Sequence, residues 1–558
     1  MRKLSVLLLA VFSFSAAAHA QSDNSKSFCQ THPSLCTELL NPYDYEGNYT
    51  GHDEPSVLFY SEKSGSGNSS VYFITLPQDP PVLPNQSGTG GTFNFQLHPA
   101  FWFGMAMCDT QGFPNLTNVC EPDSDENIFD DPSSSSPKWI GYHPGTAFME
   151  MQFYPPGWVL WPAGNSCDPL QWCAALNIDS VADSLTTLNN ADCLNTVGDE
   201  PVNFAFITKN GVPAGPPDPL NATLATFTPD GTKMLFMNSG DTLKVTLIDT
   251  SEGFKVDILD LTTGAHGLMV ASIANGFAHV KFEPTSTACH VEPYAFHPEF
   301  ATSSEHTRVS WAAHSYNVAF SDEIGHFEYC DGITDANLHA TCPSTGGDPP
   351  GSFDVDDNYC FGPAASSLIQ IGGCFGDFSP GGLGDLDFDG VPYGNNWPGT
   401  LRNADRDKRL HSTPVLFTSP LFFPRNGDDG PYHQDTTKNY NRVAFEVNLP
   451  RIELATNPPC NRTTGLNCVN PPPGADFYPF YTTTESERFA ACAWQLGGPY
   501  IPETLKEFGG TSTAEFGPLL LLAYPSPVDP GFTERYNNFR QVLPNNPCKS
   551  TLGDEGDE

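Results

Sequence analysis

The sequence predicts an all-β protein, built from two β-sandwich or jelly-roll-like domains joined by a disulfide-stapled loop region. Three observations predict this fold class. The chain contains 49 Gly and 52 Pro, and both residue types weaken or interrupt helices. Polar and apolar residues alternate over short segments, as they do in half-buried strands. The 558 residues also exceed the ~250–300 that a single core usually supports.

Residues 1–20 have the layout of a secretory signal peptide. A basic start precedes an apolar run over 4–14, and Ala18 and Ala20 place small residues where signal peptidase cuts. The run is short for a bilayer span, and no later segment approaches ~20 consecutive apolar residues. We therefore expect a secreted protein, extracellular or periplasmic in a Gram-negative host, without membrane insertion. An N-terminal membrane anchor is the alternative.

The 16 cysteines indicate disulfides, because cysteines of secreted chains are usually paired. Most lie in pairs that are close in sequence: Cys29 and Cys36, Cys108 and Cys120, Cys167 and Cys173, Cys330 and Cys342, Cys360 and Cys374, and Cys460 and Cys468. The first of these pairs ties down a leader over 21–47. Cys193, Cys289, Cys492 and Cys548 remain for longer-range closure. No CxxC motif occurs, which argues against a zinc ribbon or a thioredoxin-type redox pair.

The formal net charge of −40 at pH 7 makes nucleic acid and anionic membrane surfaces poor partners, because both are strongly negative. The acidic tail over 549–558 is typical of disordered, solvating sequence. Six N-x-S/T sequons predict a glycoprotein if the host glycosylates secreted chains. They lie at Asn48, Asn68, Asn85, Asn115, Asn221 and Asn461.

The first β-domain is predicted over 48–330. Alternating positions indicate a strand over 148–153 and two further strands over 243–247 and 254–258. The turn Ser251-Glu252-Gly253 joins the last two into a hairpin with one buried face. The second β-domain is predicted over 410–548, where Val443 to Leu449 repeats the alternation. Short strands separated by turn residues favour sandwiches or a jelly roll.

A bridging region rich in Gly, Asp and Pro is predicted over 331–409, and it contains a candidate calcium loop. Asp385, Asp387 and Asp389 alternate before Gly390, and Asn396 stands at the twelfth position. Oxygen ligands at alternate positions followed by a turn glycine open a calcium loop. The twelfth residue is not Glu, so the segment departs from an EF-hand. We expect a structural calcium ion, with an acidic surface turn as the alternative.

A histidine-rich segment provides the second candidate site. Its candidate catalytic residues are His314, Glu323, His326 and Glu328, and a strand would place the last two on one face. Histidine beside a carboxylate suits a transition metal or acid–base chemistry. Neither HxH nor HExxH occurs in this segment. A structural hydrogen-bond network is the alternative.

Asp53 and Glu54 form a third candidate, since glycoside hydrolysis needs one acid and one base or nucleophile. With 65 Asp and Glu in the chain, structural capping is the alternative. No GxSxG motif occurs, which argues against a serine hydrolase. P-loop and Rossmann glycine patterns are also absent, so no organic redox cofactor is expected.

Aromatic residues make up 12% of the chain, and exposed aromatic platforms stack on sugar rings. The candidates are Phe101 to Phe103, Trp158, Trp161, Trp172 and Phe477 to Tyr481. The alternative is that they fill hydrophobic cores.

Four segments resemble an uncharacterised microbial family of secreted, cysteine-rich, all-β proteins. They are Tyr142 to Trp158, Ser321 to Cys330, Gly384 to Gly390, and Trp494 to Gly498. The resemblance runs along most of the mature chain. It implies a secreted protein but no activity, and no family active site comes with it.

These observations lead us to expect a secreted protein that binds or acts on polysaccharide; as an enzyme it would be a glycoside-directed hydrolase. One alternative is a non-catalytic cell-surface or matrix protein stabilised by disulfides and calcium. Another is a metal-dependent extracellular oxidoreductase that uses the His/Glu cluster. Aromatic residues and a carboxylate pair on one open surface would favour the first.

Overall fold

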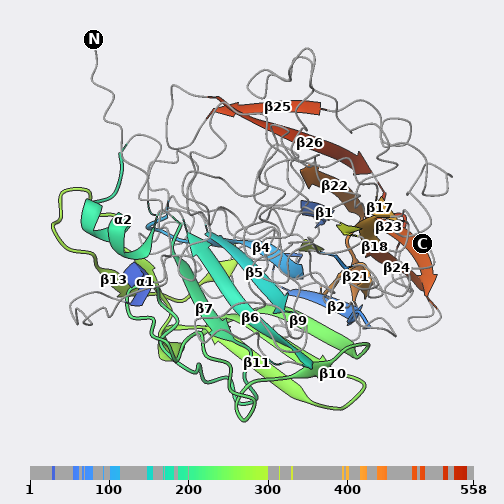
Figure 1. The fold of residues 1–558 in the computed structure, drawn as a ribbon, viewed down its shortest axis with the longest axis horizontal. Helices are drawn as coiled ribbons and strands as arrows, with labels where there is room; N and C mark the ends of the chain where they lie inside the picture. Colours follow the sequence, from blue (N-terminus) through green and yellow to red (C-terminus); the bar gives the residue numbers. More distant parts are fainter. Residues whose placement is uncertain are drawn as a thin grey trace, which may run out of the picture.

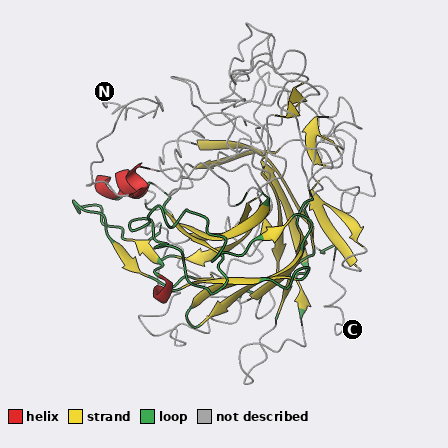
Figure 2. Ribbon diagram, turned by 60° about the horizontal axis from the view of Figure 1, so that its bottom comes forward, coloured by secondary structure: helices red, strands yellow, loops and turns green. Residues whose placement is uncertain are grey.

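The fold is all-β, as the sequence predicts; the described chain has the α-helices α1 (Phe28–Thr31) and α2 (Ala191–Val197) and a short 3₁₀ helix at Ile273–Asn275 (Figure 2). The computed structural model describes residues 28–31, 54–61, 66–67, 69–78, 92–93, 101–112, 147–154, 168, 170–180, 182, 187–198, 200–298, 313–314, 329–330, 393–394, 397–400, 415–423, 437–448, 481–486, 491–496, 520–525, 533–543 and 545–548. None of the described helices is long and apolar enough to cross a membrane.

Most of the described strands belong to three sheets (Figure 1). The strands are β1 (Glu54–Tyr60), β2 (Ser69–Thr75), β3 (Thr92–Phe93), β4 (Phe101–Cys108), β5 (Ala147–Tyr154), β6 (Gln171–Ser180), β7 (Val202–Phe206), β8 (Met237–Asn238), β9 (Thr242–Thr250), β10 (Gly253–Asp260), β11 (His266–Ala271), β12 (Ala278–Val280), β13 (Val291–Pro293), β14 (His297–Pro298), β15 (Ala313–His314), β16 (Tyr329–Cys330), β17 (Tyr393–Gly394), β18 (Trp397–Thr400), β19 (Leu416–Phe417), β20 (Leu421–Phe422), β21 (Lys438–Asn439), β22 (Arg442–Asn448), β23 (Tyr481–Ser486), β24 (Ala491–Leu496), β25 (Leu520–Pro525) and β26 (Thr533–Leu543).

The first sheet has the order β14-β4-β5-β6-β7, and its neighbouring strands pair antiparallel. Its central strands are apolar at alternate positions, which fall on one face because strand side chains alternate. Met149 and Met151 of β5 lie on that face, together with Leu176 and Ile178 of β6, and all four are fully buried. We call this the core face, and the opposite one the outer face.

The second sheet has the order β11-β10-β9-β2-β19-β24-β23. The predicted strands 243–247 and 254–258 lie within β9 and β10, which pair as a hairpin. Alternate residues of β9 are buried and half-buried, so the prediction of one buried face is confirmed. Gly253 has a φ of 132°, and a Cβ there would lie 2.3 Å from the carbonyl oxygen of Ala271. Glycine is therefore required where the hairpin turns.

The third sheet, of order β15-β1-β22-β26-β25, joins distant parts of the chain. Within it, β1 pairs along its full length with β22, which contains most of the strand predicted from Val443. In the second sheet, β2 pairs with β9 on one side and with β19 and β20 on the other. Strands from the predicted first domain (48–330) and second domain (410–548) are thus hydrogen-bonded neighbours, and the sheets do not follow that division.

The main hydrophobic cluster lies among the three sheets, and a second one, which includes Tyr154 and Phe204, lies on the outer face of the first sheet. The main cluster includes Phe59 of β1, Tyr72 of β2, Val443 of β22 and Trp494 of β24, all at most 1% exposed. Burial of apolar area on this scale is the main stabilising contribution to the fold. In Figure 1, β4 to β7 lie beside β9 to β11, while β22, β25 and β26 lie on the other side of the molecule.

Two disulfides close long loops, as predicted for Cys193, Cys289, Cys492 and Cys548. Cys193 bonds Cys289 across 96 residues, and Cys492 bonds Cys548 across 56. Cys29, Cys108 and Cys173 are also disulfide-bonded, and no described cysteine is free. Oxidised cysteines are typical of proteins that fold outside the reducing cytosol.

Candidate carbohydrate-binding face

Most sequence-predicted site residues lie outside the part of the chain that the structure describes. These are Asp53, Glu323, His326, Glu328 and the calcium-loop residues Asp385, Asp387, Asp389 and Asn396. Glu54 begins β1. His314 ends β15, where it is the cross-strand partner of Ser56 of β1. Two of the candidates are therefore on neighbouring strands of one sheet. The calcium and His/Glu sites stay predictions.

Three of the aromatic candidates for sugar stacking have another role. Phe101, Phe103 and Trp172 are at most 1% exposed and lie in the main core. Phe101 stacks on Phe153 with ring centroids 4.7 Å apart, and Phe103 packs edge-on against Phe417. These side chains fill the space between sheets, so the core-filling alternative is correct for them. Trp102 points the other way, because it occupies the alternate position of β4.

The outer face of the first sheet carries an unusual set of polar and aromatic side chains. They are Trp102 and Gly104 on β4, Phe148, Glu150, Gln152 and Tyr154 on β5, and Asn177 and Asp179 on β6. The strand register aligns them in rows, since Gly104, Glu150 and Asn177 are successive cross-strand partners. Phe148 and Gln152 are partly exposed, while the others are buried at this face.

Glu150 and Asp179 are two carboxylates on this one face. Glu150 is 7% exposed and Asp179 is 3% exposed. Glu150 lies opposite Asn177, and Asp179 lies opposite Phe148, so the two acids are diagonal neighbours on adjacent strands. Diagonal positions are ~7–8 Å apart. Carboxyl groups that cooperate in glycoside hydrolysis are separated by ~5–9.5 Å.

A chain of hydrogen bonds links Asn177 to Glu150 through Tyr154 and Gln152. Asn177 Nδ2 donates to the hydroxyl of Tyr154 at 3.3 Å, and that hydroxyl donates to Gln152 Oε1. Gln152 Nε2 in turn donates to Glu150 Oε2 at 2.5 Å. The orientation of Glu150 is thus set by side chains from both β5 and β6. A hydrogen bond donated to a carboxylate stabilises its ionised form.

Asn177 presents a buried polar atom at this face. Asn177 is 3% exposed, and its Oδ1 is buried without a hydrogen bond. Buried polar atoms in folded proteins are nearly always paired, so an exception calls for an explanation. The atom lies on the same face as the carboxylates, because Asn177 is the cross-strand partner of Glu150. An external hydrogen-bond donor would satisfy it.

An aromatic pair lies beside Glu150. Trp102 and Phe148 pack edge-to-face, with ring centroids 5.5 Å apart and an interplanar angle of 84°. Both rings lie over Gly104, where an added Cβ would come within 2.5 Å of Trp102 and 2.6 Å of Phe148. Gly104 is also the cross-strand partner of Glu150. Because Gly104 has no side chain, the rings of Trp102 and Phe148 can lie against the sheet next to Glu150.

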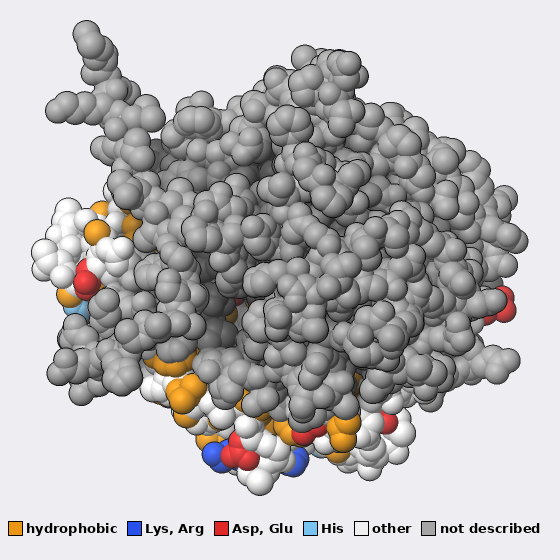
Figure 3. Space-filling view, viewed as in Figure 1, with side chains coloured by type: hydrophobic (Ala, Val, Ile, Leu, Met, Phe, Trp, Pro, Cys, Tyr) orange, Lys and Arg blue, Asp and Glu red, His pale blue; other side chains and the backbone are white. Residues whose placement is uncertain are grey.

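The strands that build this face carry no basic residue. Neither Lys nor Arg occurs in β4, β5, β6 or β7. In the view of Figure 3, the Lys and Arg side chains lie with acidic ones at the lower edge of the molecule. Described examples are the pairs Lys233–Asp230 at 3.2 Å and Lys255–Asp257 at 2.7 Å. Glu150 and Asp179 are thus the charged residues of these four strands.

The described histidines near the end of β4 form structural pairs. His279 Nδ1 lies 2.9 Å from Asp109 Oδ1, and the histidine ring stacks on Tyr294 at 4.3 Å. His297 Nδ1 lies 2.8 Å from Asp249 Oδ1. Burial raises the pKa of the Asp249 carboxyl, and the charge and hydrogen bond of His297 offset this only in part. These pairs are packed inside the protein, so they serve as internal polar links.

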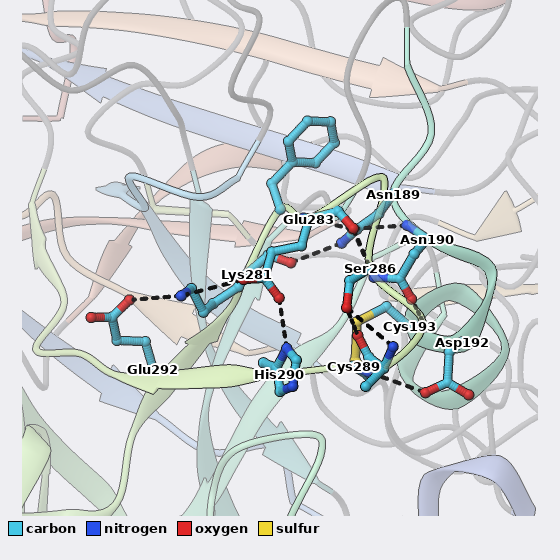
Figure 4. Close-up of polar contacts among 12 residues, drawn as sticks. Asn189, Asn190, Asp192, Cys193, Lys281, Glu283, Ser286, Cys289, His290 and Glu292 are labelled. Carbon is cyan, nitrogen blue, oxygen red and sulfur yellow. Dashed lines mark hydrogen bonds and ion pairs between the residues drawn. A yellow bond between two sulfur atoms is a disulfide. The ribbon is translucent and has the colours of Figure 1, made fainter.

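A second polar network holds α2 against the segment before β13 (Figure 4). Asn190 caps the helix by accepting from the Cys193 backbone at 3.0 Å, and Asp192 accepts from the backbone of Cys289. The Cys193–Cys289 disulfide joins the same two segments. These hydrogen bonds and the disulfide therefore have a structural role: they hold α2 to the segment before β13. The exposed His290–Glu283 pair at its edge, 2.6 Å apart, lowers the pKa of Glu283.

For the residues of the outer face, the sequence indicates which face of a strand they occupy, but it does not indicate that they come together. Glu150 lies in the predicted strand 148–153, between two methionines whose alternation already assigns it to the opposite face. Asn177 and Asp179 alternate with Leu176 and Ile178 in the same way. Their convergence depends on the β5–β6 pairing, which no local pattern shows.

Comparisons with known proteins assign no relative to this chain. No family model matches it, and neither a curated protein nor a solved structure does.

Proposed function

We propose that the protein is an extracellular polysaccharide-degrading enzyme whose active surface is the outer face of the first sheet. The observation that carries the proposal is the pair Glu150 and Asp179, two buried carboxylates placed diagonally on one face. Disulfides and the signal-peptide pattern at 1–20 support an extracellular location.

The two acids suit complementary roles in glycosidic-bond cleavage. One carboxyl group protonates the departing oxygen, while the other acts as the nucleophile at the sugar carbon or as the base that activates a water molecule. Glu150 receives a hydrogen bond from Gln152, which orients its carboxyl group. Asp179 supplies the second carboxyl group of the pair. General acid–base catalysis of this kind contributes about 10²–10⁴-fold to a rate.

The aromatic pair gives the same face a means of holding a sugar chain. Phe148 is partly exposed, and Trp102 packs against it. Aromatic rings offer apolar area at a low cost in conformational entropy. A sugar ring placed on Phe148 would lie next to Asp179, its cross-strand partner.

The test is the release of reducing ends from a panel of plant, fungal and bacterial polysaccharides by the purified mature protein. Glu150→Gln and Asp179→Asn should each lower the rate about 10²–10⁴-fold while the melting temperature changes little. Glu252→Gln is the matched control, because Glu252 is exposed in the β9–β10 turn, and it should retain full activity. Undiminished activity of both face variants would overturn the proposal.

A non-catalytic extracellular binding or matrix protein is the second candidate. The two long-range disulfides favour it, because they add durability without chemistry. Binding of a polysaccharide without release of reducing ends would support this candidate over the enzyme.

A further inference from the structure

We propose that Asn210 is a site of spontaneous chemical modification: it loses its side-chain amide by deamidation and becomes aspartate or isoaspartate. The dipeptide Asn-Gly occurs in the described chain at Asn210-Gly211 and at Asn275-Gly276. The structure leaves the first site reactive and protects the second. This inference is independent of the proposed function.

Deamidation at an Asn-Gly sequence needs water and no enzyme. The backbone nitrogen of the glycine gives its proton to solvent and attacks Cγ of the asparagine side chain. The new C–N bond closes a succinimide ring. The C–N bond of the side-chain amide breaks, and the nitrogen takes up a proton and leaves as ammonia. Water then opens the ring at either carbonyl, which gives aspartate or isoaspartate. Glycine permits the attack because no Cβ hinders its nitrogen.

The Asn210 side chain is exposed, and a hydrogen bond is donated to its carbonyl oxygen. Asn210 lies in a turn after β7, and Gly211 has a φ of 72°. Asn210 Oδ1 accepts from the backbone N–H of Val212 at 3.2 Å. Negative charge develops on this oxygen when Cγ is attacked, so a donor already placed there stabilises the transition state. No described residue accepts a hydrogen bond from Asn210 Nδ2, and the amide nitrogen can therefore leave.

Asn275 precedes the same residue type, but its side chain is bound to the backbone. It is half-buried at the end of the 3₁₀ helix Ile273–Asn275. Its Nδ2 donates to the carbonyl oxygens of Val270 at 2.9 Å and of Gly211 at 3.1 Å. The backbone N–H of Gly276, whose nitrogen would have to attack, donates to the carbonyl of Ile273 at 3.0 Å. Hydrogen bonds thus hold both the leaving amide and the attacking nitrogen, and deamidation first requires them to open.

The experiment follows both Asn-Gly sites of the mature protein during storage at neutral and at mildly alkaline pH. Peptide mapping by mass spectrometry detects the mass change from amide to acid, and electron-transfer fragmentation distinguishes isoaspartate from aspartate. In the folded protein, Asn210 should be modified at least about tenfold faster than Asn275, because breaking the hydrogen bonds of Asn275 raises its barrier. The rate at Asn210 should rise with pH, since the glycine nitrogen must lose its proton.

The unfolded chain provides the matched control. In the reduced protein held unfolded in urea, each asparagine still precedes a glycine but has lost its folded-state contacts. The rates at Asn210 and Asn275 should therefore become similar. Asn210→Gln should remove the mass change from its peptide and leave the slow change at Asn275 as it is in the parent protein.

The comparison of folded and unfolded protein decides the inference. Equal rates at the two sites of the folded protein, or faster modification of Asn275, would overturn it. So would an Asn210 that stays intact in the folded protein but is modified in the unfolded chain. No polysaccharide takes part in these measurements, so none of these outcomes changes the standing of the proposed function.

Discussion

Trp102 and Phe103 are adjacent in sequence but belong to opposite surfaces of the first sheet. Phe103 is fully buried in the main core, between Tyr72, Phe101 and Phe417. Trp102 packs against Phe148 on the outer face. The strand period of two produces this division, so neighbouring substitutions should have different effects.

We predict that Phe103→Ala lowers the free energy of unfolding by ~3–5 kcal/mol, the usual cost of emptying an aromatic core position. Trp102→Ala should cost less stability but weaken polysaccharide binding. Chemical denaturation and binding titration of both variants measure the two effects. If Trp102→Ala binds polysaccharide like the parent protein, the outer face is not the binding surface.

At Asp249, burial raises the pKa of the carboxyl above its ordinary value, although His297 is bonded to it. A raised pKa in the folded state means that this group contributes stability at low pH. That contribution is lost as pH rises from the ordinary pKa through the folded pKa. Asp249→Asn should therefore flatten this part of the pH profile of unfolding free energy.

Asp230 is the matched control for that measurement. Its pKa is lowered, mainly by the hydrogen bonds from Thr232, and its side chain is 35% exposed. Its contribution is present above the ordinary pKa and is lost as pH falls, so Asp230→Asn should change the profile in the opposite direction. If the unfolding free energy changed with pH in the same way in both variants, burial would not be what sets the pKa of Asp249.

Among the elements, α2 is the one whose position depends most on cross-linking. It has seven residues and is joined to the segment before β13 by the Cys193–Cys289 disulfide and by the backbone bond to Asp192. So short a helix is not stable alone. Disulfides that close long loops restrict the unfolded chain most.

Replacing Cys193 and Cys289 together by alanine should lower the free energy of unfolding by ~2–4 kcal/mol. The Cys492–Cys548 pair encloses a shorter loop of 56 residues against 96, so its removal should cost no more. Equilibrium unfolding of both double variants decides this. A larger loss for Cys492 and Cys548 would show that the local packing of that disulfide outweighs loop length.

The elements also show what the sequence can predict. The hairpin of β9 and β10 follows from local alternation and a turn that ends in glycine, and both signals lie within a few residues. The pairing of β2 with β19 joins residues more than 300 positions apart, and no local pattern selects that partner. The same holds for Glu150 and Asp179: the strand of Glu150 was predicted as 148–153, but the strand of Asp179 and its pairing with β5 were not.

At the scale of the whole molecule, the three sheets are assembled from both ends of the chain. β1 and β2 are each flanked by strands from beyond residue 410. A fragment of residues 21–330 would expose an edge of β2 and part of the shared core, including the surface of Phe59 that packs on Trp494.

We therefore predict that the fragment 21–330 does not fold cooperatively alone, because its core is completed by β19, β22 and β24. Co-expression with residues 331–558 should restore a single unfolding transition. Calorimetry checks both samples. A sharp unfolding transition for 21–330 by itself would show that it is an independent domain.

The central claim is that the outer face of β4 to β6 is the carbohydrate site. A crystal structure of Glu150→Gln soaked with an oligosaccharide of the polymer that the protein cleaves tests it most directly, since the variant should bind without cleaving. We expect a sugar ring against Phe148, on the face that carries positions 150 and 179. An oligosaccharide bound at another surface would contradict the account.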